Sequence, residues 1–195
     1  MSDLDLALTI ALGVGLAAAT GFRVFLPMLV VSVAAYTGHL PLSENFAWLG
    51  TPGALIMLGV AALVEILAYY IPAGVDNLLD VLATPAAVVA GTLVSAAVIT
   101  DLPPMLKWTT AIIAGGGVAG LTQGVIALLR AKSTVLTAGV GNPVIATAEL
   151  GGSLLVSLLA LAAPLVALLV VIVFLWLAMR LIRRIARSAS SSSTG

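Results

Sequence analysis

The sequence has no cysteine and only one histidine, His39. Without cysteine, the chain can form no disulfide bond, and it has no thiolate to act as a nucleophile or a metal ligand. A single histidine also excludes the metal centres and catalytic clusters that combine several imidazoles. Because the GxSxG and HExxH signatures are missing too, we expect a protein that is not an enzyme and that needs no cofactor.

Charged residues are scarce as well. They make up 8% of the 195 residues, whereas soluble domains contain roughly 25%. Hydrophobic residues make up 62%, and the mean hydropathy is +1.24. So few polar side chains cannot cover a surface that faces water, which predicts an integral membrane protein with the lipid bilayer as a partner. The net charge of zero gives no basic footprint for nucleic acid, so we expect no such partner.

Long apolar segments follow one another along the chain, and about 20 such residues cross the hydrocarbon core as a helix. The sequence therefore predicts an all-α, polytopic membrane helix bundle with about seven transmembrane segments. These segments are roughly 4–20, 24–37, 53–72, 78–99, 108–129, 143–162 and 164–181. The first pair and the last pair are joined so tightly that each is either two full spans or a short, re-entrant hairpin. Residues 1–187 form one transmembrane domain, and the Ser-rich residues 188–195 are predicted to be disordered.

Lysine and arginine predict how the chain is oriented, because they concentrate on the cytoplasmic side of a membrane. If the N-terminus is outside and the C-terminus is cytoplasmic, only Lys107 lies on the outer side. The remaining cations all lie inside: Arg23, Arg130, Lys132, Arg180, Arg183, Arg184 and Arg187. Aromatic residues then mark both interfaces. Trp48, Trp108 and Tyr36 mark the outer one, and Phe22, Phe25, Tyr69 and Tyr70 the inner one.

An internal repeat is suggested by two similar heptapeptides, GVAALVE at 59–65 and GVAGLTQ at 117–123, which share four of seven residues. Each lies in a predicted span that runs inward, and each is followed by a loop with GVDN at 74–77 or GVGN at 139–142. We infer two parallel two-helix repeats and a weaker third copy at 12–34. Repeated hairpins are common in transporters, whose binding sites lie where the repeats meet.

Four polar residues lie at one depth in the cytoplasmic half of the predicted spans, about 10 Å from the inner end at 1.5 Å per residue. They are Glu65, Thr84, Gln123 and Glu149. An ionisable residue at this depth is costly and is a functional-site hypothesis by default. Two alternatives remain open for Glu65 and Glu149: a structural ion pair with Arg23 or Arg130, or the lining of a cavity that binds a cation or proton.

Further polar residues mark the start of the two outward spans. Asp76, Asp80 and Thr84 are spaced by four residues and form one stripe on a helix. Asn77 and Asn142 stand where each can cap a helix start. Arg23 is either an anchor at the interface, with its charge reaching the headgroups, or a buried counter-charge to the carboxylates.

Four stretches resemble the bacterial integral membrane family known as domain of unknown function 4126. They are GFRVFLPMLV (21–30), LPLSENFAWLG (40–50), VDNLLDVLATPAAVVAGTLV (75–94) and GNPVIATAELGGSLL (141–155). The resemblance extends over about residues 5–185. It implies a small bacterial inner-membrane protein and no particular activity.

Taken together, these features predict a transporter or channel for a small cation, a proton or a small solute, and a homo-oligomer because the chain is short. The alternative is a non-catalytic scaffold or lipid-handling protein whose buried polar residues only specify helix packing. The candidate ligands are Glu65, Asp76, Asn77, Asp80, Thr84, Gln123, Asn142 and Glu149, with Arg23 as counter-charge. Carboxylate and amide oxygens suit a hard cation or a proton.

Overall fold

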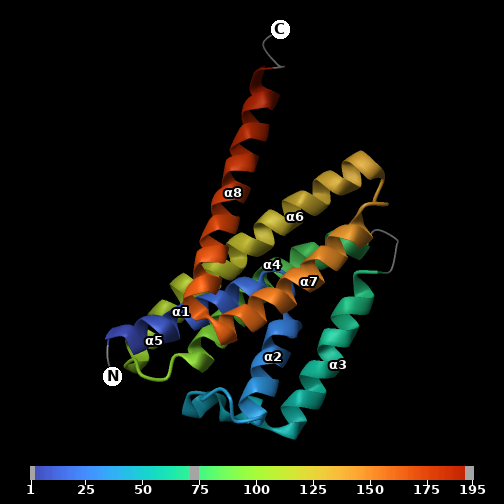
Figure 1. Ribbon diagram of the computed structural model, residues 1–195. Helices are drawn as coiled ribbons and strands as arrows, with labels where there is room; N and C mark the ends of the chain where they lie inside the picture. The colour runs from blue at the N-terminus through green and yellow to red at the C-terminus, as the bar shows by residue number, and fades with distance from the viewer. Residues whose placement is uncertain (1–2, 71–74, 192–195) are drawn as a thin grey trace.

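The computed structural model describes the backbone of residues 3–70 and 75–191 and the side chains of residues 3–70 and 82–180. This part of the chain is helical and contains no strand, as Figure 1 shows. The elements are α1 (Asp3–Thr20), α2 (Phe25–Tyr36), the short 3₁₀ helix η1 (Glu44–Gly50), α3 (Pro52–Ala68), α4 (Val75–Val98), α5 (Pro104–Thr110), the π-helical turn η2 (Ala111–Gly116), α6 (Gly117–Thr137), α7 (Asn142–Ala162) and α8 (Pro164–Ser191). The predicted all-α fold is confirmed.

In the part of the chain that the structure describes, each predicted apolar segment overlaps a helix, but a count of seven spans is not confirmed. Within the described residues, three helices are long and apolar enough to cross a membrane: α1, the continuous helix Pro104–Thr137, and α7. A fourth is counted if η1 and α3, which are bent by 71°, form one span. The other apolar helices are shorter. The 12 residues of α2 extend only about 18 Å, against a hydrocarbon core of about 30 Å.

The helix starts follow local rules that can be seen in the sequence. Proline occupies the first turn of α3, α5 and α7, where its missing N–H costs nothing. At α3, the hydroxyl of Thr51 also accepts a hydrogen bond from the backbone N–H of Ala54 at 3.3 Å, which caps the helix. At the other end of the chain, α8 continues to Ser191 and so extends into the segment 188–195 that we predicted to be disordered. Residues 192–195 lie outside the described residues.

The central element is α1, whose second half is fully buried among α4, α6, α7 and α8. Small residues allow these helices to approach closely. A Cβ atom added to Gly15 would lie 3.0 Å from the Cβ of Ala160 on α7, and one added to Gly91 on α4 would lie 2.5 Å from the Cβ of Ala119 on α6. The core of the bundle is therefore built on backbone contact around α1.

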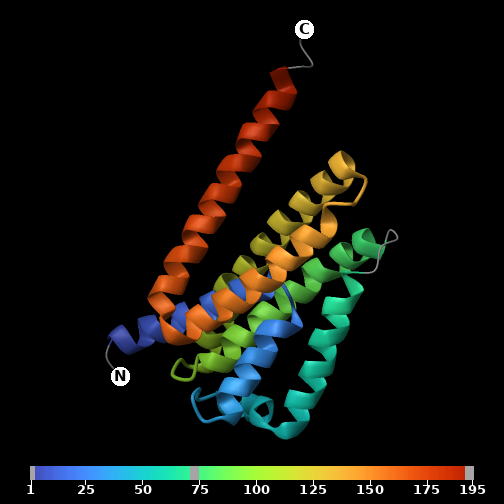
Figure 2. The ribbon, with the colours of Figure 1, turned by 45° about the vertical axis from the view of Figure 1, so that its right-hand side comes forward.

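The second part of the bundle is the hairpin of α2 and α3, which pack against each other and against η1 (Figure 2). The end of α3 and the start of α4 lie on the same side of the molecule as the end of α6 and the start of α7. This agrees with the direction of the predicted repeat. However, α3 packs mainly on α2, whereas α6 contacts α7 directly. The repeat stays a prediction.

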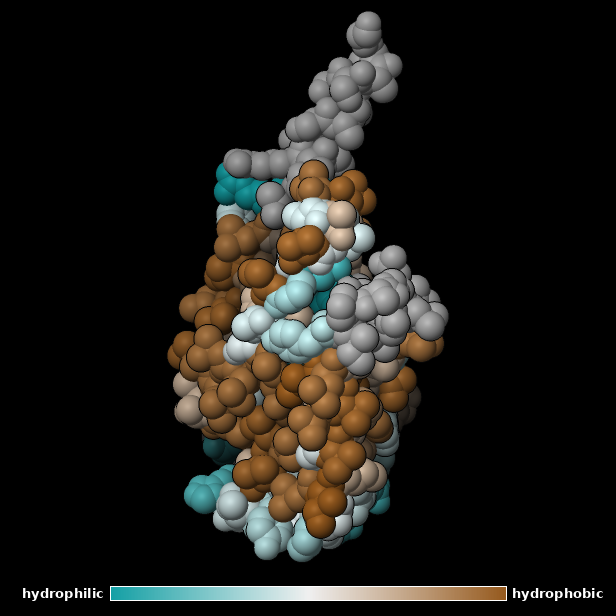
Figure 3. Space-filling model, turned by 90° about the vertical axis from the view of Figure 1, so that its right-hand side faces the viewer, coloured by the Kyte–Doolittle hydropathy of each residue, from teal (hydrophilic) through white to brown (hydrophobic). Residues whose placement is uncertain are grey.

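The outer surface is strongly apolar. Figure 3 shows a broad hydrophobic surface, with hydrophilic residues at its lower end and a second group of them in its upper part. On α3, six large apolar side chains are exposed: Ile56, Met57, Val60, Leu63, Val64 and Leu67. On α8, apolar side chains remain exposed from Leu165 to Met179, and the helix extends beyond the rest of the bundle (Figures 1 and 2). A surface of this kind matches hydrocarbon and not water, and the chain is a membrane protein.

Candidate functional site

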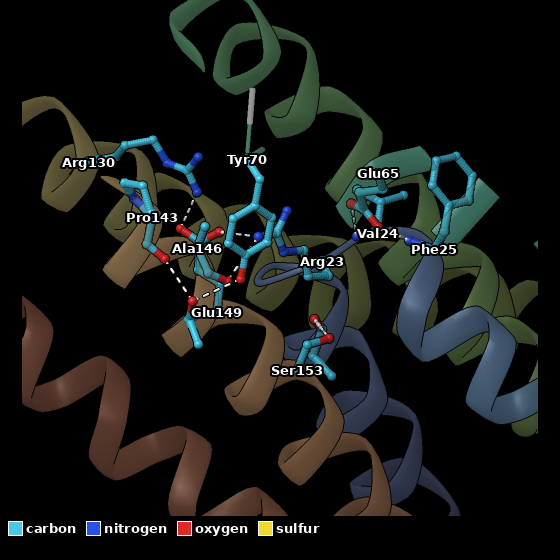
Figure 4. A network of polar contacts seen from close by, with 12 residues as sticks. Arg23, Val24, Phe25, Glu65, Tyr70, Arg130, Pro143, Ala146, Glu149 and Ser153 are labelled. Carbon is cyan, nitrogen blue, oxygen red and sulfur yellow. Dashed lines mark hydrogen bonds and ion pairs between the residues drawn. The ribbon is translucent and has the colours of Figure 1, made fainter. Parts of the chain in front are cut away.

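A cluster of buried charges lies where α6, α7 and the turn between α1 and α2 meet. Its centre is Glu149 of α7, which is only 2% exposed. Its Oε1 accepts a hydrogen bond from Nη2 of Arg130 on α6, and its Oε2 lies 3.5 Å from Nη2 of Arg23. Both arginines are 1% exposed. Figure 4 shows the two guanidinium groups approaching Glu149 from different elements. For Glu149, the structure thus contains the ion pair that was one of the two alternatives left open.

Arg23 is held in place by the tight turn that joins α1 to α2. Its Nη2 donates a hydrogen bond at 3.0 Å to the backbone carbonyl of Ala146, one turn before Glu149. The turn can sit against α6 only because position 21 is glycine. A Cβ on Gly21 would lie 2.6 Å from the carbonyl oxygen of Ala119 and 2.9 Å from Cγ2 of Thr122. Arg23 is therefore a buried counter-charge and not an anchor at the membrane interface.

Tyr69, directly after the last residue of α3, connects the two arginines. The Cζ of Arg23 lies 4.0 Å from the centre of its ring, and the Cζ of Arg130 lies 4.3 Å from it. The ring is buried, so both cation–π contacts are shielded from solvent and correspondingly stronger. The next residue, Tyr70, shares a hydrogen bond of 2.8 Å between its hydroxyl and that of Thr147 on α7. The end of α3 is thereby bound to the cluster.

Glu65 has a different role from Glu149. Its Oε1 accepts a hydrogen bond from the backbone N–H of Val24 at 2.7 Å, and its Oε2 accepts one from that of Phe25 at 3.0 Å. These N–H groups are at the start of α2, where no carbonyl of the helix can accept them. A carboxylate of α3 therefore caps α2, close enough to Arg23 for an electrostatic interaction. This contact between helices was not predicted.

The other predicted ligands are distributed around the cluster. Gln123 is buried on α6, two turns before Arg130, and Thr84 is half-buried on α4. Asn142 is buried, but it does not stand at the cap position of α7. Gly141 stands there instead, because its carbonyl already accepts hydrogen bonds from Val144 and Ile145. The side-chain amide of Asn142 donates to the hydroxyl of Thr134 at 3.0 Å and so joins α7 to α6. The prediction that Asn142 caps α7 was wrong.

Asp76, Asn77 and Asp80 fall in the first turns of α4, and their side chains lie outside the described residues. The predicted stripe from Asp76 to Thr84 therefore stays a prediction. Tyr69 is the residue that sequence reasoning missed, since it was assigned only to the inner aromatic belt. It follows Glu65 by four residues and thus lies on the same face of the helix, which was the available signal.

The chemistry of the cluster is that of charge recognition. Among the described residues, no group of three His, Asp or Glu side chains lies close enough to hold a metal ion. The Nε and Nη1 atoms of Arg23 are buried and have no hydrogen-bond partner. Oε2 of Glu149 has an ion-pair contact but no hydrogen bond. The site therefore contains charged groups whose hydrogen-bonding capacity is not used up.

Comparison with known proteins identifies a family. Residues 10–184 match the family described as Domain of unknown function (DUF4126), and the chain belongs to it. No curated protein and no solved structure matches the chain.

Proposed function

We propose that this DUF4126 protein is a membrane transporter or channel for a small ion or solute, with Glu149 in its binding site. The observation that carries the proposal is the burial of Glu149 between Arg23 and Arg130, all at most 2% exposed. Ionisable residues inside membrane helices are rare and mark substrate or proton pathways.

The energetics favour a functional role for these charges. Burying one charged side chain at the centre of a membrane helix costs roughly 2.5–3.5 kcal/mol on insertion scales, and less away from the centre. The attraction within a buried ion pair often does no more than offset such costs. Well-packed apolar residues would hold the same helices together without this cost. A binding function supplies a reason for three charges that packing alone does not need.

The position of the cluster also fits transport. Arg130 and Glu149 come from α6 and α7, Arg23 from the turn between α1 and α2, and Tyr69 from the end of α3. A site shared between elements changes its geometry whenever these elements shift, which is how transporters couple binding to movement. With three or four spans by length in the described residues, the chain is short for a complete pathway. We therefore propose a homo-oligomer, which light scattering of the purified protein in detergent tests by its mass; a monomeric mass overturns it.

We place the protein in the bacterial inner membrane, with the N-terminus outside and the C-terminus in the cytoplasm. The absence of cysteine makes this easy to test in whole cells, because single cysteines can be added without background. Cysteine at Glu44 should react with an impermeant maleimide from outside. Cysteine at Lys132 should react only after the membrane is made permeable. The reverse pattern would overturn the proposed orientation.

A structural role is the second candidate, and Glu65 favours it. Both of its oxygens accept backbone N–H groups at the start of α2, so at least one of the two carboxylates specifies helix packing. In this alternative, the protein is a scaffold or lipid-handling protein and Glu149 only joins α7 to α6.

Flux measurements separate the two candidates. We expect purified protein in liposomes to pass at least one member of a panel of small anions, cations and neutral solutes. Glu149→Gln should change that flux severalfold, because it removes the central charge. Glu44→Gln is the matched control, since Glu44 is an exposed carboxylate in η1, and its flux should equal that of the wild type. Absence of flux across the whole panel, or equal flux in Glu149→Gln, would overturn the transport proposal.

A further inference from the structure

The guanidinium of Arg23 has more hydrogen-bond donors than the protein uses. It is 1% exposed, and only its Nη2 has described partners, the carbonyl of Ala146 and the more distant Oε2 of Glu149. Its Nε and Nη1 are buried without a hydrogen-bond partner. Leaving buried donors unsatisfied is costly, and the cost is greater for charged groups. An anion that accepts a hydrogen bond from one of these donors would recover part of that energy.

The carboxylates nearby do not supply this acceptor. Glu65 directs one oxygen to the backbone N–H of Val24 and the other to that of Phe25. Glu149 bonds to Arg130 through Oε1 and reaches Arg23 only at 3.5 Å through Oε2. The shorter contact of Glu149 is therefore with Arg130, and its contact with Arg23 is too long to be a strong hydrogen bond.

A small cation, one of the ligands that the sequence predicted beside a proton or a small solute, is a poor occupant of this place. It would lie beside two guanidinium groups that already contact the carboxylate of Glu149. Like charges at about 4 Å repel each other by several kcal/mol in a partly buried site with an effective dielectric constant near 20. A cation would also compete with both arginines for the same oxygens.

We propose that the ligand of this site is a small carboxylate anion that binds to Arg23 and takes over the contact now made by Glu149. This inference rests on the proposed function and names its substrate class. A planar guanidinium fits a carboxylate through two parallel hydrogen bonds, and each of its forks pairs Nη2 with Nε or with Nη1. The anion would therefore bind Nη2, in place of Glu149, together with one of the two unused donors. The cluster already accommodates one carboxylate, that of Glu149, so its geometry suits this group. Glu149 is thus an internal competitor for the incoming anion.

Tyr69 keeps the arginines in position while the anions exchange. Its ring lies 4.0 Å from Cζ of Arg23 and 4.3 Å from Cζ of Arg130. These contacts do not involve Glu149, so they persist when its carboxylate moves away. Tyr69 is a positioning residue in this scheme and does not need to touch the ligand.

Acetate is the probe that tests the inference, with the full chain in detergent and chloride at equal ionic strength as the reference. The apparent Tm of Glu149→Ala should rise with acetate and not with chloride, because acetate fills the place of the missing carboxylate. By calorimetric titration, Glu149→Gln should bind acetate at least about tenfold more tightly than the wild type, equivalent to about 1.4 kcal/mol. Glu44→Gln, the exposed carboxylate control, should bind acetate as the wild type does.

Arg23→Lys should change the acetate affinity in the opposite direction. Lysine keeps the charge but not the fork, so acetate should bind at least about tenfold more weakly. Lys132→Met removes an exposed cation of α6 and should leave acetate affinity unchanged. If Arg23→Lys does not fold, the comparison of the Tm of Glu149→Ala in acetate and in chloride still tests the inference. Equal Tm in acetate and chloride for that variant would overturn the inference, as would unchanged acetate affinity in Glu149→Gln.

The outcomes also separate this inference from the transport proposal. Flux of ⁸⁶Rb⁺ that disappears in Glu149→Gln would support transport and overturn the carboxylate ligand. Acetate binding with the predicted changes, but without flux of any solute, would support the ligand and overturn transport.

Discussion

Two carboxylates, the half-buried Glu65 of α3 and the buried Glu149 of α7, are bound in different ways. Glu65 accepts two backbone N–H groups at the start of α2. Glu149 contacts two side chains, the guanidinium groups of Arg23 and Arg130. The partners of Glu65 are fixed by the backbone at the start of α2, whereas the partners of Glu149 are long side chains that can rotate. The difference favours a structural role for Glu65 and agrees with our proposal that Glu149 is the carboxylate that exchanges.

The largest effect is expected at Glu149. Glu149→Ala leaves two arginines buried without their shared carboxylate, which should lower the free energy of unfolding by ~3–5 kcal/mol. Helicity measured by circular dichroism during SDS titration in mixed micelles checks this value. Glu44→Ala, at an exposed carboxylate, should stay within ~0.5 kcal/mol of the wild type. A similarly small loss for Glu149→Ala would mean that the charge cluster is not formed.

A smaller and more local effect is expected at Glu65. Glu65→Ala removes the acceptor of two N–H groups and should cost ~1–3 kcal/mol. Because the lost bonds are at one helix end, amide hydrogen exchange should accelerate at Val24 and Phe25 more than in α7. If exchange instead accelerates equally throughout α7, Glu65 belongs to the same unit as Glu149 and the contrast between them is lost.

The smallest effect is expected at Tyr69. Tyr69→Leu keeps an apolar side chain but removes the ring between the two guanidinium groups, and should cost ~1–2 kcal/mol. A double-mutant cycle with Glu149→Ala, measured in the same SDS titration, tests whether the ring contacts depend on Glu149. Since the ring contacts do not involve Glu149, the two losses should add within ~0.5 kcal/mol. A much larger coupling would show that the ring holds the arginines only when the carboxylate is present.

Much of the fold was predictable because the signals are local. The apolar segments and their proline starts, such as Pro52, Pro104 and Pro143, define helices that the structure contains. The number of spans was not predictable in the same way. Residues 25–36 are apolar throughout, but a helix of 12 residues is too short to cross a membrane at full depth.

For the site, the residue types came from the sequence, and their pairings did not. Arg23 as a counter-charge to Glu149 was one of several open alternatives. The capping of α2 by Glu65 and the contact of Tyr69 with both arginines had no counterpart in the analysis of single segments. Each joins residues at least 40 positions apart or brings together three separate segments of the chain.

The amino-acid sequence by itself determined that this is an all-helical membrane protein, because 62% hydrophobic residues and 8% charged residues leave no other environment for it. It also determined that a few ionisable groups lie within the membrane helices. Only the tertiary structure decided which carboxylate meets backbone and which meets arginine. That choice depends on how α2 and α3 pack against the helices around α1, and on the glycine at position 21 that brings Arg23 to Glu149.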